Sequence, residues 1–367
     1  MSIEAPVPSR LVSLDVFRGA AIVAMILVNN PGDPAHTFAP LVHSSWNGWT
    51  LADTIFPAFL WISGFALALS MQARAAGGQG RPQLLVAALR RAALLFACGL
   101  LVEGFPYFDL SHYQYTGVLQ KIAVAWFLAY TICLYTGRRG RILALVAVFV
   151  AYVCFMSAMP VPGCDAGPWS PQCNAARYLN DRELAGHLWA AHMGNDPDGI
   201  VGSLAATASV LLGVLALSWF RSGEGPERRW RKDRLAVSSA LLIVAGLAAS
   251  AWIPINKILW TPSYALFMAG LSGLAFLAVY WLVDERGAQR FAKPLQIFGM
   301  NALAAYVLSR VGANILKKHV RGESIYRDLL LPWMQAHWAS LAFALLNVLA
   351  VFVVVWLMYR RRIFLKL

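Results

Sequence analysis

Residues 201–221 of this chain read VGSLAATASVLLGVLALSWFR, a run of apolar and small residues with no charge before Arg221. A helix of about 20 such residues crosses the roughly 30 Å hydrocarbon core of a bilayer. Runs of this kind recur along the chain, at 11–31, 49–71, 83–103, 115–136, 141–159, 201–221, 235–253, 263–283, 294–316 and 339–359. The sequence therefore predicts an all-α, polytopic membrane helical bundle of about ten transmembrane helices, forming a single domain over residues 1–367.

The composition supports this fold class and excludes others. Of the 367 residues, 59% are hydrophobic and 13% are charged, and the mean hydropathy is +0.57. Soluble domains carry about 25% charged residues, so this chain falls outside that class. The net charge of +13 raises the alternative of a nucleic-acid-binding protein. We exclude it because the Lys and Arg residues form short clusters between apolar runs rather than one soluble basic face.

The positions of the basic clusters predict an orientation. With a cytoplasmic N-terminus, the clusters that fall inside are those at 74–81, 138–141, 228–234, 286–293 and 360–362. The opposite loops at 32–48 and 104–114 contain no Lys or Arg, whereas 317–338 carries several and disagrees with the pattern. Because cytoplasmic loops carry the excess of Lys and Arg, we expect both termini to be cytoplasmic.

A dense polar stretch, His43-Ser44-Ser45-Trp46-Asn47-Gly48-Trp49-Thr50-Leu51-Ala52-Asp53, lies between the first two apolar runs, on the side expected to be external. Histidine side chains titrate near neutral pH and act as general bases or nucleophiles, so His43 is the first candidate for chemistry. The alternative is a loop histidine bonded to water or backbone. Trp46 and Trp49 are suited to stacking on a sugar or, alternatively, to an interfacial aromatic belt.

The polar residues beside this stretch also have two interpretations each. Thr50 and Asp53 match a capping box at the start of the second helix; alternatively, Asp53 pairs with Lys121, which enters the fourth run at a similar depth. Asn29 and Asn30 end the first run, where an amide satisfies helix-end carbonyls or donates to a developing oxyanion.

Basic residues near the predicted cytoplasmic surface present a similar choice. Asp15 and Arg18 stand one helical turn apart and are expected to form a local ion pair, or Arg18 binds a phosphate. Arg90 and Arg91, in the third run, offer a phosphate site or simply extend their charged ends to the inner membrane surface.

Two more polar groups precede apolar runs on the side of His43. They are Asp196-Pro197-Asp198-Gly199, before 201–221, and the stretch from Asn256 to Tyr264, before 263–283. Each alone is typical of turns or helix caps. Together with the His43 loop they form a one-sided ring, as a cavity for a polar ligand requires. The residues expected to bind substrate are Trp46, Asn47, Asp196, Asp198, Lys257 and Trp260.

The loop at 160–200 is the only connection long enough for structure of its own. Cys164 and Cys173 flank a Pro/Gly-rich part of it and could close a short disulfide if the loop faces an oxidising compartment. Residues 180–193 favour an amphipathic helix on the membrane surface. The other cysteines, Cys98, Cys133 and Cys154, lie in apolar runs and are expected to act as small hydrophobic residues.

Several of these stretches together resemble the heparan-α-glucosaminide N-acetyltransferase family, a group of transmembrane acyltransferases. The matching stretches, in chain order, are 13–19 (SLDVFRG), 43–48 (HSSWNG), 52–53 (AD), 117–123 (GVLQKIA), 162–164 (PGC), 196–200 (DPDGI), 256–264 (NKILWTPSY) and 299–302 (GMNA). Any one of them is short, but the ordered set covers the whole membrane part and is specific.

The resemblance implies transfer of acetyl from cytosolic acetyl-CoA, a co-substrate, to the amine of a glucosamine-type sugar across the membrane. It implies that His43 is catalytic and assisted by Asn29. We expect Asp53 to hold the imidazole tautomer or, alternatively, only to cap the helix. Arg18, Lys121 and Asn301 are expected to bind the donor, and no metal is expected. Lys121 stands where the family often has Arg, which keeps the charge but loses the bidentate fork.

The resemblance also bears on location and partners. Only about ten residues precede the first apolar run, so we expect a bacterial relative without the N-terminal luminal domain, in the inner membrane, with the site rim facing the periplasm. A sugar acceptor, acetyl-CoA and membrane lipid are the expected partners, with a homodimer and no nucleic acid. His43 serves as a base or as a transient acyl carrier. The alternatives are an amino-sugar permease and an O-acyltransferase of an envelope polysaccharide.

Overall fold

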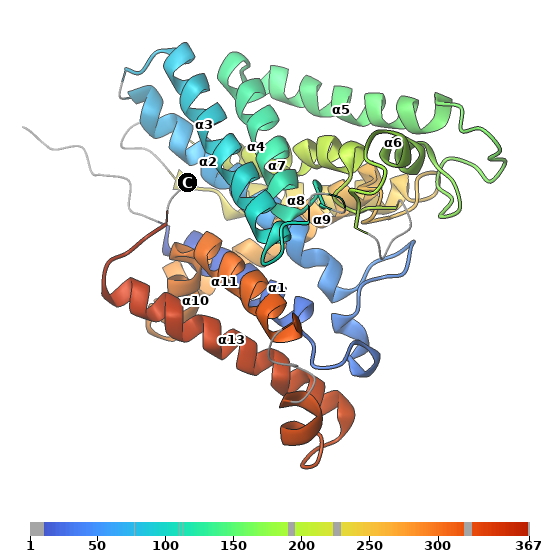
Figure 1. Ribbon diagram of the computed structural model, residues 1–367. Coiled ribbons are helices and arrows are strands. Elements are labelled where there is room, and N and C mark those ends of the chain that lie inside the picture. The colour runs from blue at the N-terminus through green and yellow to red at the C-terminus, as the bar shows by residue number, and fades with distance from the viewer. Residues whose placement is uncertain are drawn as a thin grey trace, which may run out of the picture.

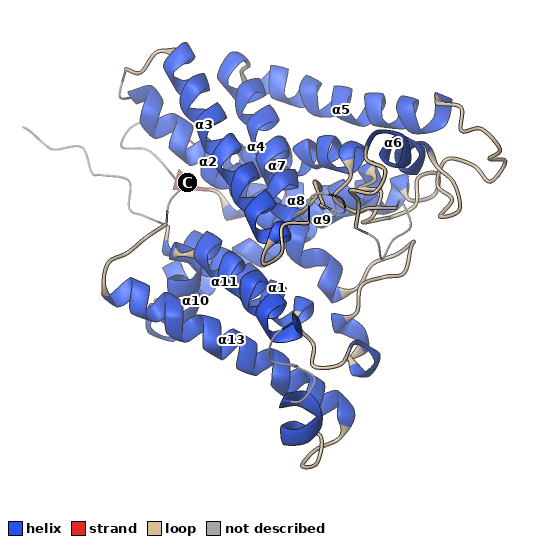
Figure 2. Ribbon diagram, viewed as in Figure 1, coloured by secondary structure: helices blue, strands red, loops and turns tan. Residues whose placement is uncertain are grey.

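A computed structural model describes residues 11–76, 78–109, 111, 113–189, 195–222, 229–318 and 325–365. Most of the described residues are helical, and two strands of two residues each pair in an antiparallel manner (Figure 2). The elements are α1 (Val12–Asn29), η1 (Pro34–His36), η2 (Ala39–Leu41), α2 (Leu51–Ala76), α3 (Arg81–Gly104), α4 (Val118–Tyr135), α5 (Arg138–Ala158), α6 (Ala175–Glu183), α7 (Ile200–Phe220), β1 (Arg221–Ser222), β2 (Arg229–Trp230), α8 (Lys232–Ala249), α9 (Pro262–Tyr280), η5 (Trp281–Glu285), α10 (Gln289–Met300), α11 (Ala302–Lys318), η6 (Ile325–Leu330) and α13 (Ala336–Arg360).

The predicted polytopic helical bundle is confirmed, with two differences from the ten expected spans. Within the described residues, eight helices are long and apolar enough to cross a membrane: α1, α2, α3, α4, α5, α7, α9 with η5, and α13. The run at 235–253 forms α8, whose first turn is charged. The run at 294–316 is broken into α10 and α11.

The break lies at Asn301, which leaves the helical conformation with φ −122° and ψ 38°. Its side chain is fully buried and is engaged elsewhere: the amide donates to Ile363 O at 3.2 Å, and its oxygen accepts from Leu365 N at 3.3 Å. An amide can satisfy backbone groups of another segment in this way, and that competes with helix propagation. The apolar sequence alone therefore predicted one continuous span where the structure has two helices.

Helix α7 forms the centre of the bundle. It is the most buried of the eight candidate spans, with 89% of an 18-residue apolar window inside the protein. It packs on α2, α4 and α5 (Figure 1). Its crossing with α2 is close because both helices present glycine there: a Cβ on Gly64 would lie 1.9 Å from Val210 O, and one on Gly213 would lie 2.0 Å from Trp61 O. Small residues at such crossings let membrane helices pack backbone to backbone.

Replacing Gly213 by alanine is expected to destabilise the protein. The new methyl group would overlap the Trp61 backbone, which cannot move as a flexible side chain can, and overpacking of this kind costs about 1–3 kcal/mol. Gly312, in α11, is a matched control because nothing lies within 4 Å of the position that a methyl group would take there; alanine at Gly312 is expected to be neutral or slightly stabilising. Thermal unfolding in detergent measures both, and an equal transition temperature for the two variants would contradict the prediction.

Helices α10, α11 and α13 gather with α1 below the group formed by α2 to α9 (Figure 1). The α1–α10 crossing also depends on glycine, since a Cβ on Gly19 would lie 1.8 Å from Leu295 O and one on Gly299 would lie 1.8 Å from Asp15 O. Helices α3, α5 and α13 bury only 22%, 17% and 17% of their spans. Their outer faces are apolar and exposed, as expected of helices that face lipid.

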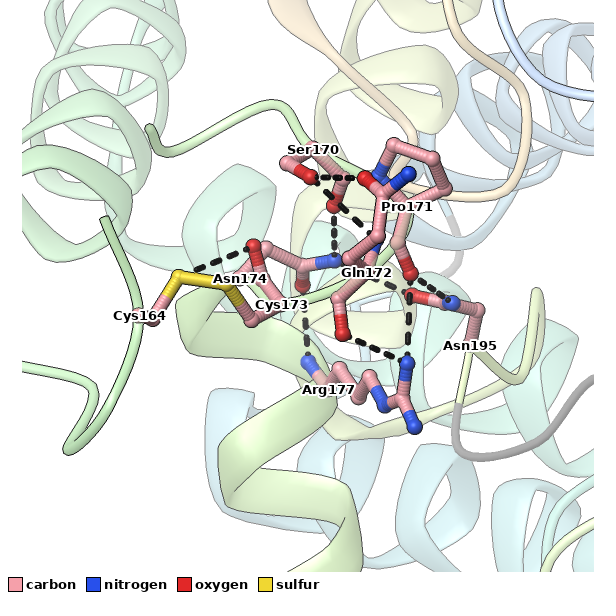
Figure 3. Close-up of a disulfide and its surroundings, with 8 residues drawn as sticks. All are labelled: Cys164, Ser170, Pro171, Gln172, Cys173, Asn174, Arg177 and Asn195. Carbon is pink, nitrogen blue, oxygen red and sulfur yellow. Dashed lines mark hydrogen bonds between the residues drawn. A yellow bond between two sulfur atoms is a disulfide. The ribbon is translucent and has the colours of Figure 1, made fainter. Parts of the chain in front are cut away.

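The loop between α5 and α7 contains the disulfide and a shorter helix than expected. Cys164 and Cys173 are bonded, as the spacing allowed (Figure 3). The helix is α6 (Ala175–Glu183), not 180–193: Asn174 caps its start, with its side chain accepting from Arg177 N at 2.8 Å, and Leu184 follows its last residue. The prediction for 184–189 was wrong because a turn follows, with Gly186 at φ 80°; residues 190–193 lie outside the described part.

Candidate active site

His43 and Asp53 are in direct contact. His43 Nδ1 lies 2.8 Å from Asp53 Oδ1, and the side chains are 44% and 1% exposed. A carboxylate only accepts hydrogen bonds, so Nδ1 carries the proton in this contact and Nε2 keeps its lone pair. An imidazole oriented in this way by a buried carboxylate is suited to act as a base or a nucleophile.

Asp53 also begins helix α2. Its second oxygen accepts from Thr50 N at 3.0 Å and from Thr50 Oγ1 at 3.2 Å, which is the predicted capping box. The same oxygen accepts from Ser44 N at 3.0 Å. Capping and contact with His43 are therefore not alternatives, because each uses a different oxygen of one carboxylate. The backbone around His43 is fixed by the same group that orients its ring.

Lys257 completes the cluster. Its Nζ lies 3.1 Å from Asp53 Oδ1, 3.0 Å from His43 Nδ1 and 3.4 Å from His43 Nε2. The alternative considered for Asp53, a pair with Lys121, is not formed: the cation at Asp53 comes from the loop before α9. Burial lowers the pKa of Lys257, and the neighbouring Asp53 carboxylate partly offsets this. The Lys257 ammonium thus lies beside both the Asp53 carboxylate and the His43 ring.

The loop that carries Lys257 is tied to the loop that carries His43. Gly48 N donates to Ile255 O at 2.8 Å, and Asn256 Nδ2 donates to Asn47 Oδ1 at 3.2 Å. The predicted sugar-binding amide of Asn47 is therefore engaged within the protein through its oxygen. Tyr264 Oη donates to the backbone oxygen of Asp53 at 2.7 Å. These bonds join the start of α9 to the start of α2.

Trp46 anchors the His43 loop on its other side. Its indole N–H donates to Trp169 O at 2.9 Å, within the loop that contains the disulfide. Trp169 in turn stacks on Tyr152 of α5, with ring centroids 6.3 Å apart. Trp46, which was predicted to stack on a sugar, thus fastens the His43 loop to the α5–α7 loop.

Lys121 is enclosed behind this cluster. Its side chain is 0% exposed, and its Nζ donates to Pro197 O at 2.6 Å and lies 3.9 Å from Asp198 Oδ1. It also lies 3.8 Å from the ring centroid of Trp260, a cation–π contact. The structure therefore places Lys121 among protein groups at the His43 end of the bundle.

The remaining predicted substrate-binding residues surround Lys121. Asp196 is buried and accepts from Thr116 Oγ1, from Trp189 N at 3.1 Å and from Asp198 N at 2.8 Å. Burial raises the pKa of Asp198, although the Lys121 ammonium opposes the shift. Trp260 is 1% exposed, and its indole donates to Ser209 at 3.1 Å. This group supports the site from behind rather than lining its surface.

The other predicted residues lie away from this cluster. Arg18 pairs with Asp15 at 3.2 Å, as the spacing predicted, and it also reaches Gly299 O at 3.5 Å. Arg18 and Asn301 lie toward the end of α1 that is opposite to the His43 loop. Asn29 is the exposed last residue of α1, and in the described structure no hydrogen bond joins it to His43. Its neighbour Asn30 is buried and donates to Ile26 O at 2.7 Å.

A cleft of about 640 Å³ opens beside His43. Its lining residues come from the α1–α2 loop and the first turn of α13, and they are Thr37, Phe38, Ala39, Val42, His43, Thr50, Gln335, His337 and Trp338. Sequence reasoning did not identify the α13 wall. The pair His337-Trp338 at the start of the last apolar run was the available signal, because it repeats the His-plus-Trp composition of the first polar loop.

The chain is similar to known proteins over a segment that contains several of these residues. Positions 10–169 match a family model described as heparan-alpha-glucosaminide N-acetyltransferase, catalytic. The predicted resemblance to this family is confirmed. The matched segment contains His43, Asp53 and Lys121, and the Lys257 loop and the α13 wall follow it in the chain.

Two curated relatives extend the likeness beyond that segment. The human heparan-alpha-glucosaminide N-acetyltransferase is 26% identical over 98% of this chain, and the mouse protein of the same name is 28% identical over 82% of it. The chain spans 60% and 53% of the lengths of these relatives. The alignment with the human relative therefore includes Lys257 of this chain. It does not cover the whole length of either heparan-α-glucosaminide N-acetyltransferase.

Proposed function

We propose that this protein is a membrane acetyltransferase that moves acetyl from acetyl-CoA to the amine of a glucosamine-type sugar. One observation carries the proposal: His43, at the edge of a cleft, is held by the buried Asp53 carboxylate through Nδ1, with the Lys257 ammonium beside the ring. The family match over this segment supports the same reaction. An oriented imidazole beside a cleft is suited to take the proton from an attacking amine in acyl transfer.

The proposed reaction is direct transfer in a ternary complex. The amine of glucosamine is mostly protonated near neutral pH, and His43 Nε2 takes one proton from it so that the nitrogen lone pair can attack. A nitrogen–carbon bond forms at the thioester carbonyl, and the carbon–sulfur bond breaks with its electron pair going to the CoA sulfur. Two protons leave the nitrogen overall: one ends on the CoA thiol and the other in solvent.

Lys257 is proposed to assist the departure of the thiolate. Its ammonium group lies beside the imidazole, and the lowered pKa makes it a stronger proton donor than an ordinary lysine. The same charge stabilises the oxyanion that forms on the thioester oxygen. Asn29 remains a proposed second oxyanion donor on the strength of the family resemblance.

We further propose that the donor approaches from the Arg18 end of the bundle and the acceptor from the His43 end. Arg18 and Asn301 are the proposed donor-binding residues, and Arg18 offers a cation for the CoA phosphates. The charge distribution of the loops supports a cytoplasmic Arg18 end. The Cys164–Cys173 disulfide supports an oxidising compartment at the His43 end, as a periplasmic rim would provide.

The decisive assay uses the purified full chain with acetyl-CoA and glucosamine. Release of free CoA thiol with equimolar N-acetylglucosamine is expected, and glucose, which lacks the amine, is expected to release little CoA. An amino-sugar permease would release none with either sugar. Faster acetylation of glucose than of glucosamine would instead identify an O-acyltransferase and refute the proposal.

A further inference from the structure

Tyr152 of α5 contacts the loop before α9 directly and the α1–α2 loop through one other residue. Its hydroxyl donates to Leu259 O at 2.8 Å. Its ring stacks on Trp169, and the backbone oxygen of Trp169 accepts from the indole N–H of Trp46 at 2.9 Å. Tyr152 is 5% exposed, so its hydroxyl is shielded from water. One buried tyrosine thus connects the two loops that form the candidate site.

The turn after Lys257 depends on contacts of this kind. Trp260 adopts φ 56°, a left-handed conformation that residues with a side chain seldom adopt and that persists where surrounding contacts hold it. The residue before it, Leu259, is held through both backbone groups: its N–H donates to Asn256 Oδ1 at 2.8 Å, and its oxygen accepts from Tyr152. Without the Tyr152 hydroxyl, a buried carbonyl two residues after Lys257 would lose this donor, which is costly.

The loop closed by the Cys164–Cys173 disulfide holds Trp169 against Tyr152. Trp169 lies inside this loop, and the disulfide fixes the segment before it to the start of α6. A closed loop has fewer conformations than an open one. Three hydrogen bonds to backbone oxygens fasten the segment after Trp169 (Figure 3): from Asn174 Nδ2 to Ser170 O at 2.9 Å, from Asn195 Nδ2 to Pro171 O at 2.8 Å and from Arg177 Nη1 to Gln172 O at 2.6 Å.

The geometry of the reacting groups leaves little room for movement of either loop. Lys257 Nζ lies 3.0 Å from His43 Nδ1, and contacts at this distance weaken steeply when their atoms separate. A misplacement of about 1 Å, caused far from the chemistry, can lower a rate by roughly 10²-fold. Tyr152 and Trp169 attach both loops to α5, in addition to the bonds that join the loops to each other.

We propose that Tyr152 is a positioning residue for acetyl transfer, and that it acts with the disulfide-closed loop 164–173 to keep Lys257 beside His43. This inference rests on the proposed function, because Lys257 and His43 are the groups assigned to that reaction. Tyr152 acts on them through Leu259 and Trp169. Its loss therefore lowers kcat and leaves KM for both substrates little changed.

Tyr152→Phe removes the hydroxyl and keeps the ring. We expect kcat per folded molecule to fall roughly tenfold, with KM for acetyl-CoA and for glucosamine changed less than about twofold. Tyr130→Phe is the matched control and should keep the wild-type kcat: Tyr130 is 1% exposed in another spanning helix, and within the described structure its hydroxyl has no hydrogen-bond partner. An unchanged kcat in Tyr152→Phe, or an equal loss in Tyr130→Phe, would overturn the proposal.

Removal of the disulfide tests the contribution of the loop. Cys164→Ala combined with Cys173→Ala is expected to lower kcat per folded molecule roughly tenfold as well, because Trp169 is then held from one direction only. Cys154→Ala is the control, since Cys154 is an exposed free cysteine of α5. A wild-type kcat in the double variant would refute the role of the loop.

Hydrogen exchange measured by mass spectrometry, without either substrate, separates this inference from the proposed reaction. Tyr152→Phe is expected to exchange faster than wild type in peptides that cover 255–261, and the double cysteine variant in those that cover 43–50, whereas peptides of α7 stay unchanged. This result supports the positioning role even if the wild-type chain transfers no acetyl. Unchanged exchange in both loops, or equally faster exchange in α7, refutes it even if acetyl is transferred.

Discussion

Replacement of His43 by alanine is expected to reduce the rate of acetyl transfer by roughly 10²–10⁴-fold, the usual contribution of a positioned general base. No other described imidazole shares its contact with Asp53, and Lys257 cannot take a proton while it is charged. The fold should survive, because the His43 side chain is 44% exposed. Steady-state release of CoA thiol measures the loss.

A second histidine variant controls for the loss of an imidazole as such. His187 bonds to the backbone oxygen of Tyr113 at 2.8 Å and stacks on Tyr115, outside the cleft, so His187→Ala should retain transfer. Near-wild-type turnover by His43→Ala would remove the basis of the proposed function. Rapid quenching with radiolabelled acetyl-CoA tests the mechanism: an acetylated His43 formed and consumed as fast as the product appears would replace direct transfer by an acyl-imidazole route.

Asp53→Asn is expected to have the second largest effect, again roughly 10²–10⁴-fold on kcat, as for other orienting carboxylates. The asparagine amide would donate to His43 Nδ1, and this would move the ring proton to Nε2 and remove the base. Lys257 would also lose its charge partner, and an unpaired buried charge is strongly destabilising. The thermal transition should therefore fall together with the rate.

The two effects of Asp53→Asn are separable by measuring turnover per folded molecule. The folded fraction is obtained from size-exclusion chromatography and thermal unfolding in the same detergent. A normal kcat for the folded fraction would mean that Asp53 serves only to begin α2. A low kcat with KM for acetyl-CoA little changed would instead identify an interaction made in the transition state.

Local features of this chain could be predicted from sequence because neighbouring residues determine them. Continuous apolar runs predicted the spanning helices, and the three-residue spacings of Thr50–Asp53 and Asp15–Arg18 predicted contacts that the structure contains. The Cys164–Cys173 disulfide follows similarly from a short loop. In each case the backbone between the partners is short, and few conformations are available to it.

Tertiary contacts could not be predicted with the same success. Lys121, in the first turn of α4, and Lys257, in the loop before α9, lie at the same end of the bundle. The sequence does not show which of the two reaches Asp53. The choice depends on the loop before α9, where Trp260 adopts φ 56° and Asn256 accepts from Leu259 N. The wall formed by His337 and Trp338 depends likewise on how α13 docks beside α1.

The glycine crossings between helices also determine where the bundle can open. Where two backbones touch, as at Gly64 with α7 and at Gly299 with α1, the helices form interlocked pairs that slide little. The joint between α3 and α11 is different: its polar links include the Glu103–Arg310 ion pair at 2.9 Å and the Asn314–Phe105 hydrogen bond at 3.2 Å. Polar links can exchange with water, whereas interlocked backbones cannot. The joint between α3 and α11 is therefore expected to separate more easily than the glycine crossings.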